Sequence, residues 1–216
     1  MILYGRGQSR SFRCLWALLE SGVQFEYIHV DRENLPDNYQ GLNSQIKVPT
    51  LVDEDLVLNE SAAIVNYAGQ LASSELIPTE IKRRAYYDEI CYFIMTELEQ
   101  PLWSIGKHMF AIPEEYRLKA MLKTAKWEFE KAQTALQVRL ADRDFAVGTT
   151  FTLADVCLSA SPENGRSIGH LQVGIRLLFL ERPAWVFVTR WSLCCPARSV
   201  QSVMRKILRP TNVVRP

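Results

Sequence analysis

Residues 1–75 alternate short apolar segments with helical patterns, and this order limits the folds open to the chain. Residues 2–4 predict a strand, and residues 25–30 predict a second one. Between them, apolar side chains recur at the spacing of one helix face: Phe12, Leu15, Trp16 and Leu19. Gly22 can end that helix. A strand, a helix and a strand in succession predict a right-handed crossover and a parallel pair of strands.

A hairpin followed by a helix completes the first part of the chain. Residues 50–52 and 56–58 are apolar and flank a short acidic turn, while residues 31–46 are polar with room for one short helix. After the hairpin, apolar residues again recur at helical spacing: Ile64, Val65, Ala68, Leu71 and Ala72. The order βαβ then ββα is the thioredoxin-like arrangement. We therefore predict an α/β thioredoxin-like domain over residues 1–75.

Residues 76–216 predict a second domain that is an all-helical bundle. Thr79 can cap a long helix after Pro78, and Pro101 should kink that helix. Pro113 suits the first turn of the next helix. The apolar or small residues of that helix are spaced by three and four positions: Leu118, Leu122, Ala125, Phe129, Ala132, Leu136 and Leu140.

Residues 151–156 (FTLADV) predict the start of another helix. The Thr152 hydroxyl and the Asp155 carboxylate can satisfy each other's free backbone N–H groups, as in a capping box. Such a cap contributes on the order of 1 kcal/mol to stability. By itself the motif indicates only that a helix begins there.

Charge and cysteine usage narrow the class of protein. The net charge is +1, which gives no electrostatic reason to expect nucleic acid or a membrane surface as a partner. The first residues lack the features of a signal peptide, and no apolar run reaches the roughly 18 residues of a membrane span. The five cysteines have neither metal-ligand nor disulfide spacing, so we expect no metal and a reducing, cytoplasmic setting.

Several segments, in this order and at these intervals, resemble the glutathione transferase superfamily, specifically the bacterial cytosolic enzymes of the serine type. They are residues 3–18 (with LYG, Ser9, Arg13 and LWAL), 47–51 (KVPTL), 60–64 (ESAAI), 97–103 (ELEQPLW) and 151–155 (FTLAD). The resemblance covers about residues 1–160. It implies the two-domain fold predicted above, glutathione as co-substrate and a homodimer.

The resemblance implies that a hydroxyl at the start of the first helix donates a hydrogen bond to the glutathione sulfur. Ser9 lies four residues before Arg13, as in the serine-type classes, and is the expected catalytic residue. The positive end of the helix would add to the stabilisation of the thiolate. Ser11 is the second candidate for this role, and the alternative for Ser9 is a plain helix cap.

The resemblance also implies a cis peptide bond between Val48 and Pro49, with the Val48 backbone pairing with the cysteinyl part of glutathione as an added strand. The alternative is a trans proline at a strand edge. Lys47 is expected to meet the glycyl carboxylate, although a loop lysine is often only solvated.

At the start of the next helix, Ser61 and its backbone would hold the γ-glutamyl carboxylate, because helix N-termini bind anions. Glu60 would face the α-ammonium group. A simpler reading, compatible with the first, makes Asn59 the N-cap and Glu60 a first-turn acid. For the electrophile, the resemblance suggests a pocket with Ser11, Trp103 and Lys107, the last two of which can equally be core or surface residues.

The expected activity is conjugation of the glutathione thiolate to small electrophilic compounds, as in detoxification. One alternative is a non-catalytic glutathione-binding or regulatory protein of the same fold. Another is a glutathione-dependent thiol oxidoreductase, which would need a cysteine where Ser9 stands; Cys14 lies a turn further into the helix.

The resemblance ends near residue 158. Pro162 and Gly165 stop a helix where the family continues one, and residues 161–216 contain nine Lys or Arg but two acids. We interpret residues 159–216 as a divergent or frame-shifted terminus, which would put the activity of the chain in doubt. A basic tail with its own partner is the alternative.

Overall fold

The computed structural model describes residues 1–6, 9–31, 33–140 and 143–158. The described residues form two compact units that divide between Ile77 and Pro78. The sequence interpretation of residues 159–216 as a divergent or frame-shifted terminus concerns residues that lie outside the described ones.

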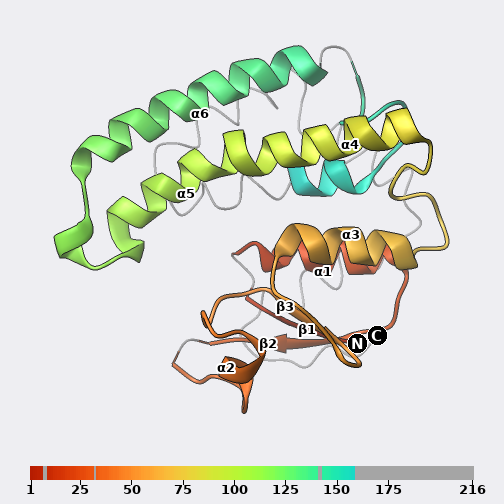
Figure 1. Cartoon of the computed structure of the whole chain (residues 1–216), viewed down its shortest axis with the longest axis horizontal. Helices are drawn as coiled ribbons and strands as arrows, with labels where there is room; N and C mark the ends of the chain where they lie inside the picture. The colour runs from red at the N-terminus through yellow and green to blue at the C-terminus, as the bar shows by residue number, and fades with distance from the viewer. Residues whose placement is uncertain (7–8, 32, 141–142, 159–216) are drawn as a thin grey trace. The chain divides into compact units, whose positions relative to one another are not determined.

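The first unit contains a four-stranded mixed sheet in the order β2-β1-β3-β4 (Figure 1). Its strands are β1 (Ile2–Gly5), β2 (Glu26–His29), β3 (Thr50–Asp53) and β4 (Leu56–Leu58). β1 pairs with β2 in parallel, as the crossover predicted, while β3 is antiparallel to both β1 and β4. The thioredoxin-like fold class is therefore confirmed.

Three helices accompany this sheet: α1 (Ser11–Ser21), α2 (Tyr39–Leu42) and α3 (Ser61–Leu71). α1 and α3 pack against each other on one face of the sheet, and α2 lies on the opposite side (Figure 1). α1 ends at Gly22, whose φ of 71° is left-handed, a conformation in which glycine has no Cβ penalty.

The buried face of α1 differs from the predicted one. Of the predicted face only Leu15 is buried. The buried residues of α1 are Ser11, Arg13, Cys14, Leu15, Ala17, Leu18 and Ser21. Three of the predicted residues, Phe12, Trp16 and Leu19, are half-buried. The packed face includes the polar Arg13, which is 0% exposed, so a search for apolar side chains alone did not identify it.

The second unit is helical, as predicted, and begins with α4 (Ile81–Phe93), a π-helical segment η1 (Ile94–Glu99) and α5 (Gln100–Gly106) in one continuous run. Glu80, not Thr79, caps α4, because its carboxylate accepts hydrogen bonds from the N–H groups of Lys82 and Arg83. A kink was predicted at Pro101. The irregular part of the helix is the preceding segment, where η1 replaces regular α-helix.

The chain then reverses direction and returns as a long helix. A second π-helical segment, η2 (Lys107–Ala111), and a short 3₁₀ turn, η3 (Glu114–Tyr116), precede α6 (Lys119–Leu140). Pro113 therefore begins the 3₁₀ turn, and its predicted place in the first turn of the long helix was wrong. The predicted stripe is correct for Ala125, Phe129, Ala132 and Leu136, which are buried, but wrong for Leu118, which precedes α6 and is exposed.

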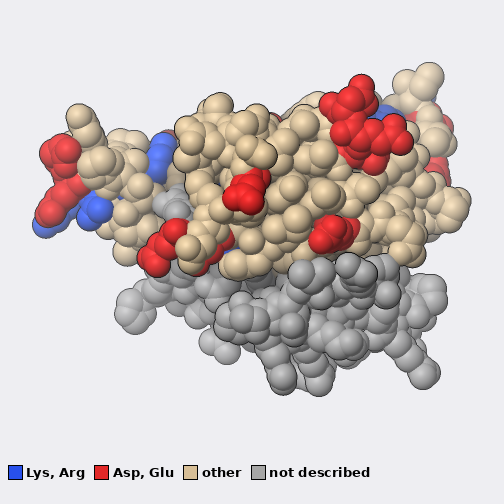
Figure 2. Space-filling view, turned by 90° about the horizontal axis from the view of Figure 1, so that it is seen from below, with Lys and Arg blue, Asp and Glu red and all other residues tan. Residues whose placement is uncertain are grey.

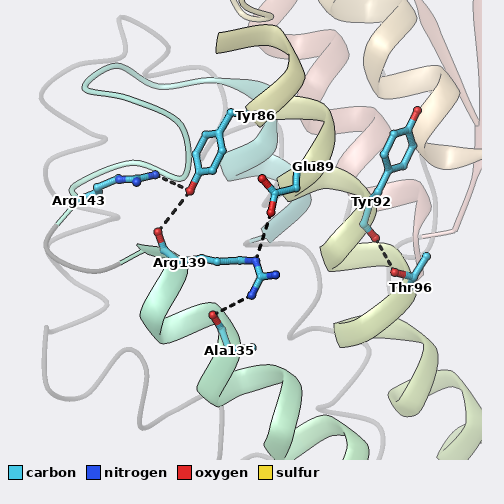
Figure 3. Close-up of polar contacts among 7 residues, drawn as sticks. All are labelled: Tyr86, Glu89, Tyr92, Thr96, Ala135, Arg139 and Arg143. Atoms are coloured by element: carbon cyan, nitrogen blue, oxygen red, sulfur yellow. Dashed lines mark hydrogen bonds and ion pairs between the residues drawn. The ribbon is translucent and has the colours of Figure 1, made fainter. Parts of the chain in front are cut away.

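Polar contacts join α4 to the C-terminal end of α6 (Figure 3). The Arg139 guanidinium lies 3.6 Å from the Glu89 carboxylate and 4.3 Å from the centroid of the Phe93 ring. The Tyr86 hydroxyl donates to the Arg139 carbonyl over 3.3 Å and accepts from Arg143. Partly exposed ion pairs of this kind contribute about 0–1 kcal/mol each, so packing of the buried helix faces remains the main stabilising term.

A short helix over residues 153–158 ends the described part of this unit. The buried Asp155 carboxylate accepts hydrogen bonds from the N–H groups of Thr152 at 2.9 Å and Ala146 at 2.8 Å. The predicted capping box is confirmed in its carboxylate half. The Thr152 hydroxyl differs from expectation, since it donates to the Asp155 carboxylate over 3.2 Å.

Among the described helices, none combines the length and the apolar character needed to cross a membrane. On the face of the molecule shown in Figure 2, the charged side chains of the described residues stand in small groups among uncharged ones.

Candidate functional site

Strand register brings three separate segments to one end of the sheet. Tyr4 in β1 lies opposite Thr50 in β3, and Leu51 in β3 lies opposite Leu58 in β4. The end of β1, the start of β3 and the end of β4 are therefore neighbours. Residues 6, 9–11, 47–49 and 59–61 lie at this common end of the sheet.

Ser9 lies in the turn between β1 and α1, where its hydroxyl is part of a compact hydrogen-bonded corner. The Ser9 hydroxyl donates to the Arg6 carbonyl at 2.7 Å and lies 2.9 Å from Ser11 Oγ. Ser9 Oγ also accepts from the Ser11 N–H at 3.1 Å, although the N-cap residue of α1 is Arg10 and not Ser9. Ser9 is half-buried, whereas Ser11 is 1% exposed.

The two serines thus differ in what they can offer a ligand. Ser11 Oγ accepts from the Arg6 N–H at 3.2 Å and is enclosed by protein. The Ser9 hydroxyl keeps partial access to solvent. Its hydrogen can leave the Arg6 carbonyl by rotation about a single bond, so Ser9 is the accessible hydroxyl donor of this corner.

Gly5 makes this corner possible. A Cβ at Gly5 would lie 2.8 Å from Ser11 Cβ and 3.0 Å from a ring carbon of Tyr27, closer than packed atoms allow. We expect Gly5→Ala to lower the free energy of unfolding by about 1–3 kcal/mol through overpacking. Urea unfolding measures this, with Gly41→Ala as the control, because a Cβ at Gly41 meets no atom within 4 Å. Equal unfolding midpoints for the Gly5 variant and the wild type would contradict the close contact.

The peptide bond between Val48 and Pro49 is cis, as predicted. Pro49 is buried and Val48 is half-buried. Two residues earlier, Ile46 has a φ of 50°, an uncommon value for a β-branched residue. Lys47 is exposed, and its backbone carbonyl is held by the phenol of Tyr39.

A polar network that the sequence reading did not single out lies behind this loop. Tyr39, Asn43 and Thr50 are 1%, 5% and 0% exposed, yet each carries a polar side chain that is hydrogen-bonded. Burial raises the pKa of Tyr39, opposed by its hydrogen bond with Thr50, so the phenol stays a protonated donor at neutral pH. These residue types are common on surfaces, and only the fold reveals that they are buried together.

Helix α3 begins at Ser61, with Glu60 as its N-cap residue in extended conformation. The Glu60 side chain makes no capping hydrogen bond and is exposed. Ser61 is 6% exposed, and its carbonyl accepts from the Cys14 thiol at 3.5 Å, which joins the first turn of α3 to α1. The alternative with Asn59 as N-cap was wrong, because the Asn59 side chain bonds to Thr50 and Leu42 instead.

The two residues suggested for the electrophile belong to the second unit. Trp103 lies in α5 and is 42% exposed, and Lys107 is the first residue of η2 and half-buried. Trp103 is therefore a surface side chain within its own unit. Among the described residues, no three His, Cys, Asp or Glu side chains gather as a metal site would require.

Comparison with known proteins agrees with the fold of both units. Residues 1–70 match the family described as glutathione S-transferase, N-terminal domain, and residues 100–162 match glutathione S-transferase, C-terminal domain. A glutathione S-transferase of Triticum aestivum is 30% identical over 177 residues, which make up 80% of this chain and 80% of the wheat protein. The chain belongs to the glutathione S-transferase family.

Two solved structures of this family resemble the chain in fold. BphK, a bacterial glutathione transferase solved as a ternary complex, has a TM-score of 0.76 at 20% identity, and the match covers 97% of this chain and 100% of BphK. A sphingomonad glutathione S-transferase complexed with glutathione has a TM-score of 0.73 at 22% identity, and the match covers 96% of this chain and 98% of the other. At such identities the likeness shows the fold alone.

Proposed function

We propose that this protein conjugates the thiolate of glutathione to small electrophilic compounds. One observation carries the proposal. The accessible Ser9 hydroxyl, the cis Val48–Pro49 segment and the N-terminus of α3 leave the same end of the sheet. In a tripeptide with a thiol at its centre and an acidic group at each end, the central residue would meet Ser9 and Val48, and one acidic end would meet the N-terminus of α3.

Each part of glutathione has a partner in this arrangement. The Val48 backbone would pair with the cysteinyl residue as an added strand. The γ-glutamyl carboxylate would bind the N-terminus of α3 at Ser61, with the exposed Glu60 beside the α-ammonium group. Lys47 is exposed, so its ammonium group is accessible and would bind the glycyl carboxylate.

Ser9 would act by stabilising the thiolate. Its hydroxyl would turn from the Arg6 carbonyl to donate to the glutathione sulfur, while the Ser11 N–H continues to donate to Ser9 Oγ. The thiol proton passes to solvent, a carbon–sulfur bond forms with the electrophile, and the leaving group departs. Each pKa unit by which the thiol is lowered corresponds to about 1.4 kcal/mol.

The wheat relative is a glutathione S-transferase, and the sphingomonad structure contains glutathione, which supports the assignment of ligand and reaction. We further propose a cytoplasmic homodimer with a role in detoxification, divided into domains at residues 1–75 and 76–216. The thiol oxidoreductase alternative is not favoured, because the side chain of Cys14 is buried at 0% exposure.

Binding and turnover test the proposal separately. Isothermal titration should detect glutathione binding, and the absorbance of the thioether product should rise when the protein is mixed with glutathione and 1-chloro-2,4-dinitrobenzene. Binding without product would favour the non-catalytic alternative. A chain that neither binds glutathione nor forms product would refute the assignment.

A further inference from the structure

A chain of hydrogen bonds runs behind the candidate glutathione site, from α2 to the residue before Glu60. We propose that Tyr39, Asn43, Thr50 and Asn59 are positioning residues that hold residues 47–49 and 59–61 in one fixed arrangement before glutathione arrives. This inference rests on the proposed function, since it concerns the same ligand.

The first arm of the network holds the loop that precedes Pro49. The Lys47 carbonyl accepts from the Tyr39 hydroxyl at 2.6 Å and from Asn43 Nδ2 at 3.0 Å. Asn43 also folds the loop back on itself, because its carbonyl accepts from the Ile46 N–H at 2.9 Å and its side-chain oxygen from the Gln45 N–H at 3.1 Å. The side chains of Tyr39 and Asn43 thereby hold the backbone next to Val48 in place.

The second arm extends from the first residue of β3 to the entry of α3. The Thr50 hydroxyl donates to Asn59 Oδ1 at 2.7 Å, and Asn59 Nδ2 donates to the Leu42 carbonyl at 3.1 Å. Asn59 is separated from Ser61 only by Glu60. The position at which α3 begins is therefore tied to the last residue of α2 and to the first residue of β3.

Thr50 joins the two arms. Its Oγ1 accepts from Asn43 Nδ2 at 3.2 Å and lies 3.0 Å from the Tyr39 hydroxyl, while its one hydrogen goes to Asn59. Buried polar groups must be paired, and here they are paired with one another. The network consequently leaves Thr50 no free bond for a ligand, so it would act on glutathione through the backbone that it positions.

The strained backbone of the loop explains why such support is needed. A β-branched residue with φ above zero, as at Ile46, persists only where its surroundings over-determine the conformation. Ordering a loop on binding weakens affinity, and a preorganised loop avoids that loss. Without the network, residues 43–48 would relax and glutathione would have to order them.

Removal of single hydroxyl groups tests the inference. Tyr39→Phe and Thr50→Val should raise the dissociation constant for glutathione about five- to tenfold, measured by titration calorimetry. The kcat at saturating glutathione should stay within about twofold of wild type, because the reacting groups are untouched. Thr50→Ser keeps the hydroxyl and should restore wild-type affinity.

Tyr67→Phe is the matched control. It also removes a phenol hydroxyl from the first unit, one that donates to Asp53 at 2.6 Å, away from residues 47–49. We expect it to leave the dissociation constant unchanged. Equal affinities in the Tyr39 and Tyr67 variants would overturn the inference, even if both variants lose thermal stability.

Amide hydrogen exchange of the ligand-free protein gives a second readout. Thr50→Val should speed exchange in residues 43–48 and 59–61 together, and faster exchange in only one segment would refute the coupling between the arms. If the wild type does not bind glutathione, the proposed function fails. If it binds but the variants bind equally well, only the positioning role fails.

Discussion

Replacing Ser9 by alanine is expected to lower kcat/KM for glutathione conjugation about tenfold or more. A hydrogen bond to a charged acceptor contributes about 1.5–3 kcal/mol, and each 1.4 kcal/mol corresponds to a factor of ten. The loss of kcat/KM should reflect a smaller fraction of bound glutathione in the thiolate form. The pH at which kcat/KM reaches half its maximum should therefore move upward in the variant, because the bound thiol regains a pKa closer to its free value of about 8.5.

Two serine variants make this result specific. Ser74→Ala removes an exposed hydroxyl from the same unit outside the predicted site and should leave turnover unchanged. Ser11→Ala removes a buried acceptor of the Arg6 N–H, so we expect a loss of stability with a smaller effect on the pH profile. Full activity in Ser9→Ala combined with inactivity in Ser11→Ala would reassign the role to Ser11.

Replacing Asp155 by alanine should lower the free energy of unfolding by about 3–5 kcal/mol, because it leaves two buried backbone N–H groups unpaired. Those groups belong to Ala146 and Thr152. Denaturant unfolding measures the loss. Glu128→Ala on the exposed face of α6 is the control and should change stability by less than about 0.5 kcal/mol. A similar loss of unfolding free energy in both variants would show that the loss does not come from the hydrogen bonds of Asp155.

The same residue should make stability depend on pH in a definite direction. Burial raises the pKa of Asp155 to about 6 from 3.8, against the effect of its hydrogen bonds. Between these values the folded state holds a proton that the unfolded state has released, so stability from this group falls as pH rises. Asp155→Asn removes the titration. The difference in free energy of unfolding between wild type and this variant should be larger at pH 5 than at pH 7 by about 1 kcal/mol. An equal difference at both pH values would contradict the raised pKa.

The sequence predicted the first unit well because its signals are local and redundant. Short apolar strands, a helix ended by Gly22 and a hairpin around residues 53–55 each restrict the order of elements, and that order predicted the thioredoxin-like topology. The cis bond at Pro49 was expected from the resemblance alone, since X–Pro bonds are cis in only about 5–6% of cases in folded proteins.

What the sequence missed depends on burial and on exact helix ends. Thr79 and Pro113 carry start signals, but Glu80 caps α4 and α6 begins at Lys119, because sequence signals locate helix ends only to within a few residues. The network of Tyr39, Asn43 and Thr50 went unnoticed because polar residues in a polar segment look solvated until strand pairing buries them.

The π-helical segment η1 has a consequence for how the long run from α4 to α5 stays in the core. Its buried side chains recur every fourth position, at Ile90, Ile94, Leu98 and Leu102. In a helix with 3.6 residues per turn, such a row would drift around the axis by about 40° at each step. The wider turn of η1 takes up part of that drift, so the row stays buried from α4 through α5. One residue can thus be accommodated in mid-helix while the packing on either side of it is preserved.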